Sequence, residues 1–296
     1  GPAMPVASVL RLILLASIWG GSFLFMRLTA NSLGPAMLVE GRVLAAALFL
    51  LLMSLYLGRK LQFISYIKHF FIIGAFNIAF PFLMFAYAAQ TLNASTLAII
   101  NSTAPLFGAV IASLWQRERL PLKAGLGLLV GMLGVSVLVG QQAMTLGEQG
   151  LLAIAACLLA ALMYGFSANY TKVAPAVAPF ENAHGSMWAS VIIVLPLLPF
   201  IPVRDPITLP ISLSVLVLGV ICTGIAYLLY FKLVKDDGPA SALSVTFLVP
   251  LFGILWGRLF LGEAIGLNTL LGAILVITGT VLVTGFSFKK ALRKAH

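Results

Sequence analysis

Three prolines lie inside long apolar runs of the sequence, and each has a polar residue four positions before it. The pairs, polar residue first, are Asn77 and Pro81, Asn101 and Pro105, and Thr246 and Pro250. A proline within a helix has no N–H to donate, so the carbonyl four positions earlier loses its hydrogen bond. A free carbonyl beside an amide or hydroxyl side chain can bind the polar part of a small solute. Alternatively, Ser or Thr hydroxyls and neighbouring helices satisfy these carbonyls, and the prolines only kink the helices.

Aromatic and hydroxyl side chains recur in the same runs. A pocket with aromatic walls and a few amides or hydroxyls suits a small amphipathic molecule, such as an amino acid with an apolar side chain. The candidate lining residues are Trp19, Ser22, Asn77, Tyr87, Asn101, Ser102, Tyr164, Ser167, Thr223, Tyr227, Tyr230, Ser244 and Thr246, with Pro81, Pro105 and Pro250 as hinges. The alternative is that the aromatics face outward, as they do at the borders of membrane-spanning helices.

Other kinds of chemistry find no support in the sequence. No two of His69, His184 and His296 have metal-ligand spacing, and no Ser-His-Asp group can be assembled. Cys157 and Cys222 lie in apolar runs and give no disulfide framework. A phosphate-binding Gly-rich loop ending in Gly-Lys-Ser/Thr is also missing, which excludes ATP-driven pumping by this chain. We expect no enzyme activity, no metal and no cofactor.

The composition indicates that lipid, and not water, surrounds most of this protein. Hydrophobic residues make up 61% of the chain and charged residues 9%, with a mean hydropathy of +1.10. A soluble domain is about half apolar and about a quarter charged. This composition predicts an all-α integral membrane protein. The net charge of +10 resides in short breaks between apolar runs, where membrane proteins carry Lys and Arg, so we expect no nucleic-acid partner.

Apolar stretches of about 20 residues, enough for a helix to cross a bilayer, recur along the chain. The predicted transmembrane spans are 7–27, 35–56, 69–89, 94–115, 122–140, 150–170, 180–201, 210–231, 239–261 and 265–287. Alternate connections carry fourteen Lys and Arg residues on the side of both termini and three on the other. By the positive-inside rule both termini are cytoplasmic, and the basic tail 288–296 is expected at anionic lipid headgroups.

An internal repeat runs through the chain at a constant offset of 145 residues, from Pro105-Leu106-Phe107-Gly108 to Pro250-Leu251-Phe252-Gly253. Two residues separated by this offset are repeat mates. Further pairs are Gly20 and Gly165, Gly74 and Gly219, Glu118 and Glu263, Gly127 and Gly272, and Gly134 and Gly279. The predicted division is a tail at 1–6 that includes a tag remnant, a first five-helix repeat at 7–140, a second at 150–287, and the tail at 288–296.

Five spans per repeat is an odd number, so the second repeat must enter the membrane from the opposite side. The mates Arg27 and Lys172 are expected on opposite sides, as this inversion requires. Two inverted repeats form a pseudo-two-fold structure with its axis in the membrane plane, a construction typical of secondary transporters that bind substrate between the repeats. Some channels share it.

Several short motifs resemble the drug/metabolite transporter superfamily, specifically its ten-helix EamA-type exporters. They are Ile18-Trp19-Gly20-Gly21-Ser22, Ala104-Pro105-Leu106-Phe107, Arg117-Glu118-Arg119-Leu120, Val249-Pro250-Leu251-Phe252 and Leu261-Gly262-Glu263-Ala264. The resemblance implies two inverted five-helix bundles around a central cavity, and export of metabolites or amino acids across a bacterial inner membrane. The aromatic amino acid exporter type is among its relatives in architecture.

Charged residues within the spans bear on energy coupling. Glu40 and Arg42 lie on the second span, where we expect Arg42 to reach headgroups, and Glu181 and His184 lie near the start of the seventh. Smaller four-helix relatives carry an acid in the first span for proton exchange, which this sequence lacks. Facilitated export and proton-coupled antiport both stay open, with a channel, a lipid-handling protein and a membrane enzyme as further alternatives.

The expected partners are a small-molecule substrate and membrane lipid, with the protein a monomer or a homodimer. Gly127-x-x-x-Gly131 on the fifth span permits close helix approach. It is compatible with dimerisation and with packing inside the chain.

Overall fold

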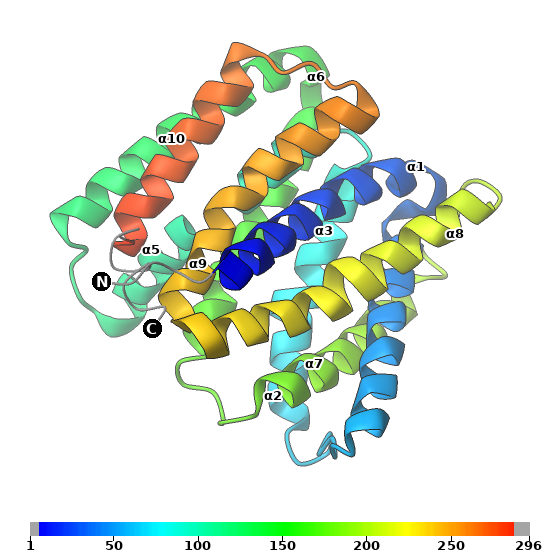
Figure 1. Ribbon diagram of the computed structural model, residues 1–296. Helices are drawn as coiled ribbons and strands as arrows, with labels where there is room; N and C mark the ends of the chain where they lie inside the picture. The colour runs from blue at the N-terminus through cyan, green and yellow to red at the C-terminus, as the bar shows by residue number, and fades with distance from the viewer. Residues whose placement is uncertain (1–5, 287–296) are drawn as a thin grey trace.

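The computed structural model describes residues 6–286, and throughout this range the chain forms helices joined by turns and loops (Figure 1). The helices in order are α1 (Val6–Leu57), α2 (Ile67–Ile73), the π-helix η1 (Gly74–Ala79), α3 (Phe80–Ala88), α4 (Ala94–Asn101), α5 (Ala104–Gln116), α6 (Leu122–Tyr170), α7 (Pro179–Val194), the 3₁₀ turn η2 (Leu195–Leu197), α8 (Leu209–Leu216), the π-helix η3 (Val217–Ile225), α9 (Ala226–Leu261) and α10 (Leu267–Thr284). The predicted C-terminal tail, and all but the last residue of the predicted N-terminal tail, lie outside the described residues.

Seven helical stretches of the described chain are long and apolar enough to cross a membrane. Two of them, α1 with 52 residues and α6 with 49, are long enough for two crossings each. Each contains one glycine with non-helical backbone, Gly34 (φ 74°, ψ 161°) in α1 and Gly147 (φ 67°, ψ −145°) in α6. Glycine adopts positive φ without steric cost, so one residue turns the chain where the sequence predicted a break. The chain is a multi-pass membrane protein.

Two predicted boundaries differ from the structure. The span predicted at 180–201 is helical only to Leu197, because Pro196 and Pro199 lack the N–H groups that would continue the helix. The break predicted between 231 and 239 is itself helical and belongs to α9. Figure 1 shows the chain changing direction there, between its yellow and orange parts.

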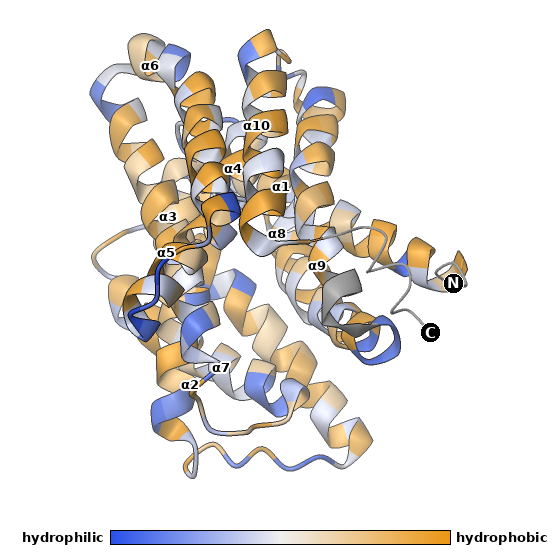
Figure 2. Ribbon diagram, turned by 90° about the vertical axis from the view of Figure 1, so that its left-hand side faces the viewer, coloured by the Kyte–Doolittle hydropathy of each residue, from blue (hydrophilic) through white to orange (hydrophobic). Residues whose placement is uncertain are grey.

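The surface of the molecule is apolar along the helices. Figure 2 shows hydrophobic colour along the helix shafts, and hydrophilic colour gathers mostly near the turns. Large side chains such as Leu52, Leu122 and Leu129 are exposed. A soluble monomer does not present so much continuous apolar surface, and this one is suited to lipid.

The two halves of the chain are inverted with respect to one another, as their closest glycine contacts demonstrate. A Cβ added at Gly127 of α6 would lie 2.7 Å from the carbonyl oxygen of Gly279 in α10. One added at Gly134 would lie 3.0 Å from the carbonyl oxygen of Gly272. Gly272 is the repeat mate of Gly127, and Gly279 that of Gly134. Equivalent helices therefore lie side by side and antiparallel, which requires a two-fold axis across them.

A second pair of glycine contacts is also related by the two-fold axis. Gly20 of α1 packs against Gly253 of α9, and its mate Gly165 packs against Gly108, the mate of Gly253. The first helix of each repeat thus contacts the fourth-span helix of the other. The glycine motif on the fifth span serves packing within the chain, since Gly131 lies against Leu106 of α5 and against Gly279.

The glycine contact between α6 and α10 predicts an unequal response to two neighbouring alanine substitutions. In Gly127→Ala the added methyl group meets the backbone of α10, and overpacking of this kind costs about 1–3 kcal/mol. In Gly125→Ala the methyl group enters open space, with nothing within 4 Å. Both changes gain the same helix propensity, so Gly125→Ala is the matched control. We expect a lower thermal unfolding midpoint in detergent for Gly127→Ala alone, and equal midpoints would contradict the contact.

Candidate functional site

A cavity of about 350 Å³ lies between the two halves of the chain. Its wall is formed by side chains of both repeats and of both π-helices. The lining residues are Trp19, Ser22, Phe23, Met26, Arg42, Asn77, Phe82, Phe85, Asn101, Ala104, Tyr164, Cys222, Thr223, Tyr227, Tyr230, Thr246 and Val249.

Most of the predicted lining residues meet at this cavity, and four do not. Those that line it are Trp19, Ser22, Asn77, Asn101, Tyr164, Thr223, Tyr227, Tyr230 and Thr246. Tyr87 is 40% exposed and points away from it, two positions after Phe85, which does line it. Ser102, Ser167 and Ser244 are buried outside the lining, and the Ser102 hydroxyl donates to the Ile99 carbonyl at 2.6 Å.

The three prolines have different local effects. Pro105 is near the start of α5, and the helix is interrupted at Ser102-Thr103 just before it. Pro81 is near the start of α3, directly after η1. Pro250 lies within α9, which continues through it. The polar residue four positions before each proline lines the cavity, so the freed carbonyls belong to the part of the fold where irregular backbone is tolerated in a membrane.

The π-helices shape the same wall. η1 and η3 occupy corresponding places in the two repeats, since Gly74 in η1 and Gly219 in η3 are mates. Asn77 projects from η1, and Cys222 and Thr223 project from η3, all into the lining. A π-turn holds one more residue than an α-turn and often occurs at functional sites. Apart from their glycines, these segments carry no pattern in the sequence that predicts a π-helix.

Much of the cavity lining consists of repeat mates, so the two-fold axis that relates the repeats also relates the two sides of the cavity. The mated pairs in the wall are Trp19 and Tyr164, Asn77 and Cys222, Phe82 and Tyr227, Phe85 and Tyr230, Asn101 and Thr246, and Ala104 and Val249. Ring contacts repeat the relation. The ring centroids of Trp19 and Tyr230 are 5.6 Å apart, and those of their mates Tyr164 and Phe85 are 6.4 Å apart. The cavity is an aromatic box with an amide or hydroxyl on each side.

Sequence reasoning missed several lining residues, and the repeat itself could have found two of them. Phe85 and Cys222 are mates of predicted residues, so the offset of 145 points to them. The remaining missed residues are Phe23, Met26, Arg42, Ala104 and Val249.

Arg42 was expected at the headgroups, and that expectation was wrong. Its side chain is 6% exposed and turns into the cavity wall. Nε donates to the Thr223 hydroxyl at 3.0 Å, Nη1 lies 3.6 Å from the Met26 sulfur, and Cζ is 4.0 Å from the centre of the Phe82 ring. These contacts hold the guanidinium inward because the half of α1 that follows Gly34 packs against η3, where a Cβ at Gly219 would meet the Arg42 carbonyl oxygen.

The other charged candidates lie away from the cavity. Glu40 is buried, and neither carboxylate oxygen has a hydrogen-bond partner in the described part of the chain. Glu181 forms a two-bond ion pair with Arg59, at 2.6 and 3.0 Å, and this hydrogen bonding raises the pKa of the Arg59 guanidinium. His184 accepts from Trp188 Nε1 at 2.9 Å. Among residues 6–286 no group of His, Cys, Asp and Glu could hold a metal ion.

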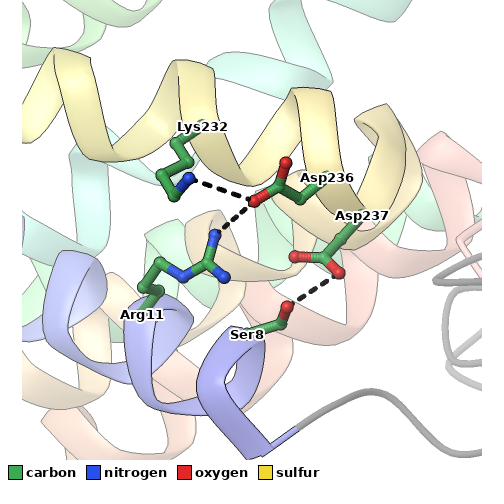
Figure 3. Close-up of polar contacts among 5 residues, drawn as sticks. All are labelled: Ser8, Arg11, Lys232, Asp236 and Asp237. Atoms are coloured by element: carbon green, nitrogen blue, oxygen red, sulfur yellow. Dashed lines mark hydrogen bonds and ion pairs between the residues drawn. The ribbon is translucent and has the colours of Figure 1, made fainter.

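Polar contacts join the start of α1 to α9 (Figure 3). Arg11 pairs with Asp236 at 2.8 Å, and Lys232 reaches the same carboxylate at 3.6 Å. The Ser8 hydroxyl donates to the Asp237 carboxylate at 2.8 Å. Each repeat supplies one side of this cluster, so these contacts couple the two halves between the start of α1 and the first part of α9.

Comparison with known proteins gives a consistent result. A family model described as EamA-like transporter family matches residues 7–140 and again 151–285. Uncharacterized transporter YdfC of Bacillus subtilis (strain 168) is 25% identical, over 94% of each chain. Protein PecM of Dickeya dadantii (strain 3937) is 24% identical, over 94% of this chain and 92% of PecM. A solved crystal structure with 16% sequence identity superposes with a TM-score of 0.63, covering 96% of this chain and 99% of the other.

Proposed function

The chain belongs to the EamA-like transporter family, and we propose that it exports small metabolites, above all amino acids with aromatic or other apolar side chains, across the bacterial inner membrane. The observation that carries this proposal is the cavity between two inverted halves, walled by mated aromatic and polar residues.

The size and lining of the cavity support a small amphipathic solute. Pockets for small molecules have volumes of about 300–1,000 Å³ and combine apolar walls with a few placed polar groups. At about 350 Å³ this cavity is at the small end of that range. Trp19, Tyr164 and Tyr230 offer ring surfaces to an apolar side chain, and Asn77 and Asn101 offer amides to polar groups.

The inverted construction supports alternating access as the mechanism. When two similar halves exchange conformations, a cavity open to one side becomes open to the other without a new fold. In this proposal the helices make ten crossings, and both termini lie in the cytoplasm, where the Lys and Arg residues of the connections are concentrated.

We expect the cavity residues to be required for transport and dispensable for folding. In proteoliposomes, Trp19→Ala and Asn101→Ala should each lower counterflow of labelled L-phenylalanine by about tenfold, equivalent to about 1.4 kcal/mol. Tyr56 is an aromatic residue of α1 that is 85% exposed and outside the cavity, so Tyr56→Ala is the control. Unaltered counterflow in both cavity variants would remove the cavity from the transport path, and steady ionic conductance without counterflow would favour a channel.

Alternating access also predicts that a bridge between the two halves stops transport. Ser8 and Asp237 face one another across α1 and α9, so Ser8→Cys together with Asp237→Cys places two thiols close enough for an oxidising reagent such as copper phenanthroline to join them in a disulfide. Linking them should block counterflow, because α1 and α9 can no longer separate at this point. Each single-cysteine variant, treated with the same reagent, controls for reaction at Cys157 and Cys222. Full counterflow in the linked protein would contradict movement at this point.

Energy coupling has two candidates. Arg42 is the charged residue of the lining within the described part of the chain, and no carboxylate lines it, which supports facilitated export down a gradient. Buried, unpartnered Glu40 is the feature that favours proton-coupled antiport. Under facilitated export an imposed pH gradient should not drive L-phenylalanine accumulation, and Glu40→Gln should leave counterflow intact. Accumulation driven by the gradient and lost in Glu40→Gln would establish antiport.

A further inference from the structure

Arg42 breaks the two-fold relation that organises the cavity. Its repeat mate is Met187, which is fully buried and outside the lining. Two of its three contacts, Met26 and Thr223, are likewise lining residues whose mates do not line the cavity. Within the described part of the chain, a largely symmetric aromatic box therefore has one cationic side chain in its wall.

The positive charge of Arg42 is not balanced by the protein around it. Among residues 6–286, none of the ion pairs includes Arg42. The Thr223 hydroxyl donates its proton to the Leu218 carbonyl at 2.8 Å and so accepts from Arg42, while the Met26 thioether and the Phe82 ring are neutral acceptors. Glu40 is on the same helix two positions away, which places it on another face. A buried charge in a membrane protein is usually paired or marks a substrate pathway.

The chemistry of the lining selects among possible anions. A guanidinium presents a planar fork of N–H donors that matches a carboxylate. One positive charge balances one negative charge, so a monoanion fits better than a doubly charged phosphate. The remaining wall is aromatic and aliphatic apart from the amides of Asn77 and Asn101, the hydroxyls and the Cys222 thiol, so the body of the ligand is apolar.

We infer that Arg42 is the carboxylate-binding residue of the cavity, and that its ligands are small monocarboxylates with an apolar body. This inference rests on the proposed function, of which it names the substrate class. An amino acid meets the requirement with its carboxylate at Arg42 and its amino group toward the amide oxygens. An amine or amide without a carboxylate does not.

A pair of isosteric ligands tests the inference on the unaltered protein. 3-Phenylpropionate and 3-phenylpropanamide have the same shape and differ in the charge of one end. Binding to the detergent-purified chain, followed by thermal stabilisation at pH 7.5, should favour the acid by at least tenfold in affinity. This comparison needs no variant to fold. Equal binding of the two ligands, or no binding of the acid, would overturn the inference.

Substitutions at Arg42 test whether this residue causes the preference for the acid over the amide. Arg42→Gln should lower the affinity for the acid by at least tenfold and make acid and amide equal, and Arg42→Lys should keep part of the preference because it keeps the charge. Arg204→Gln removes a positive charge from an exposed loop and should change nothing. A preference that survives Arg42→Gln would overturn the inference.

The counterflow assay separates this inference from the proposed function. Acid-selective binding that depends on Arg42, without counterflow of L-phenylalanine, would refute that transport role and leave the binding inference intact. Counterflow of L-phenylalaninamide equal to that of L-phenylalanine would support transport and refute the role of Arg42.

Discussion

In lipid, every backbone N–H and carbonyl must find its partner within the protein, and this constraint shapes the whole molecule. Regular helix satisfies it along most of the described chain. The helix departs from regularity in the spans where the chain turns, at Gly34 and Gly147, and where it borders the cavity. The interruption before Pro105 and the π-helices η1 and η3 are all of the second kind. Irregular backbone and the cavity therefore coincide for a physical reason.

Close glycine contacts convert two similar halves into one body. In lipid the hydrophobic effect does not favour helix association, so van der Waals packing at short distance supplies most of the stabilisation. At the antiparallel pair formed by α6 and α10, Gly127 contacts Gly279, the repeat mate of Gly134. Gly134 in turn contacts Gly272, the repeat mate of Gly127. Because the contact repeats through the two-fold axis, each half reproduces the environment of the other. The cavity between them inherits the same symmetry, down to the ring pairs of Trp19 and Tyr164 with their neighbours.

Arg42 is the charged exception to the two-fold relation of the cavity within the described part of the chain. An arginine near the centre of a membrane helix costs about 2.5–3.5 kcal/mol on insertion scales. Thr223, Met26 and Phe82 offset part of that cost with a hydrogen bond, a weak sulfur contact and a cation–π contact. None of them neutralises the charge. In the inference drawn above, the balancing negative charge comes from the carboxylate of the ligand.

The membrane class, the duplication and its inversion could all be predicted from the amino-acid order, because apolar length, the positive-inside bias and an odd number of predicted spans per repeat are one-dimensional properties. The same order identified the polar residues at Asn77, Asn101 and Thr246, since a proline acts on a carbonyl at fixed spacing. The direction in which each side chain faces depends instead on how the helices pack together. Tyr87 lies two positions from Phe85, about 200° around a helix, and so points away while Phe85 points inward. Arg42 turned inward because the packing of α1 on η3 put Thr223 and Phe82 within its reach. The rotation of a helix about its own axis depends on its partners, and no local pattern in a uniformly apolar span records it.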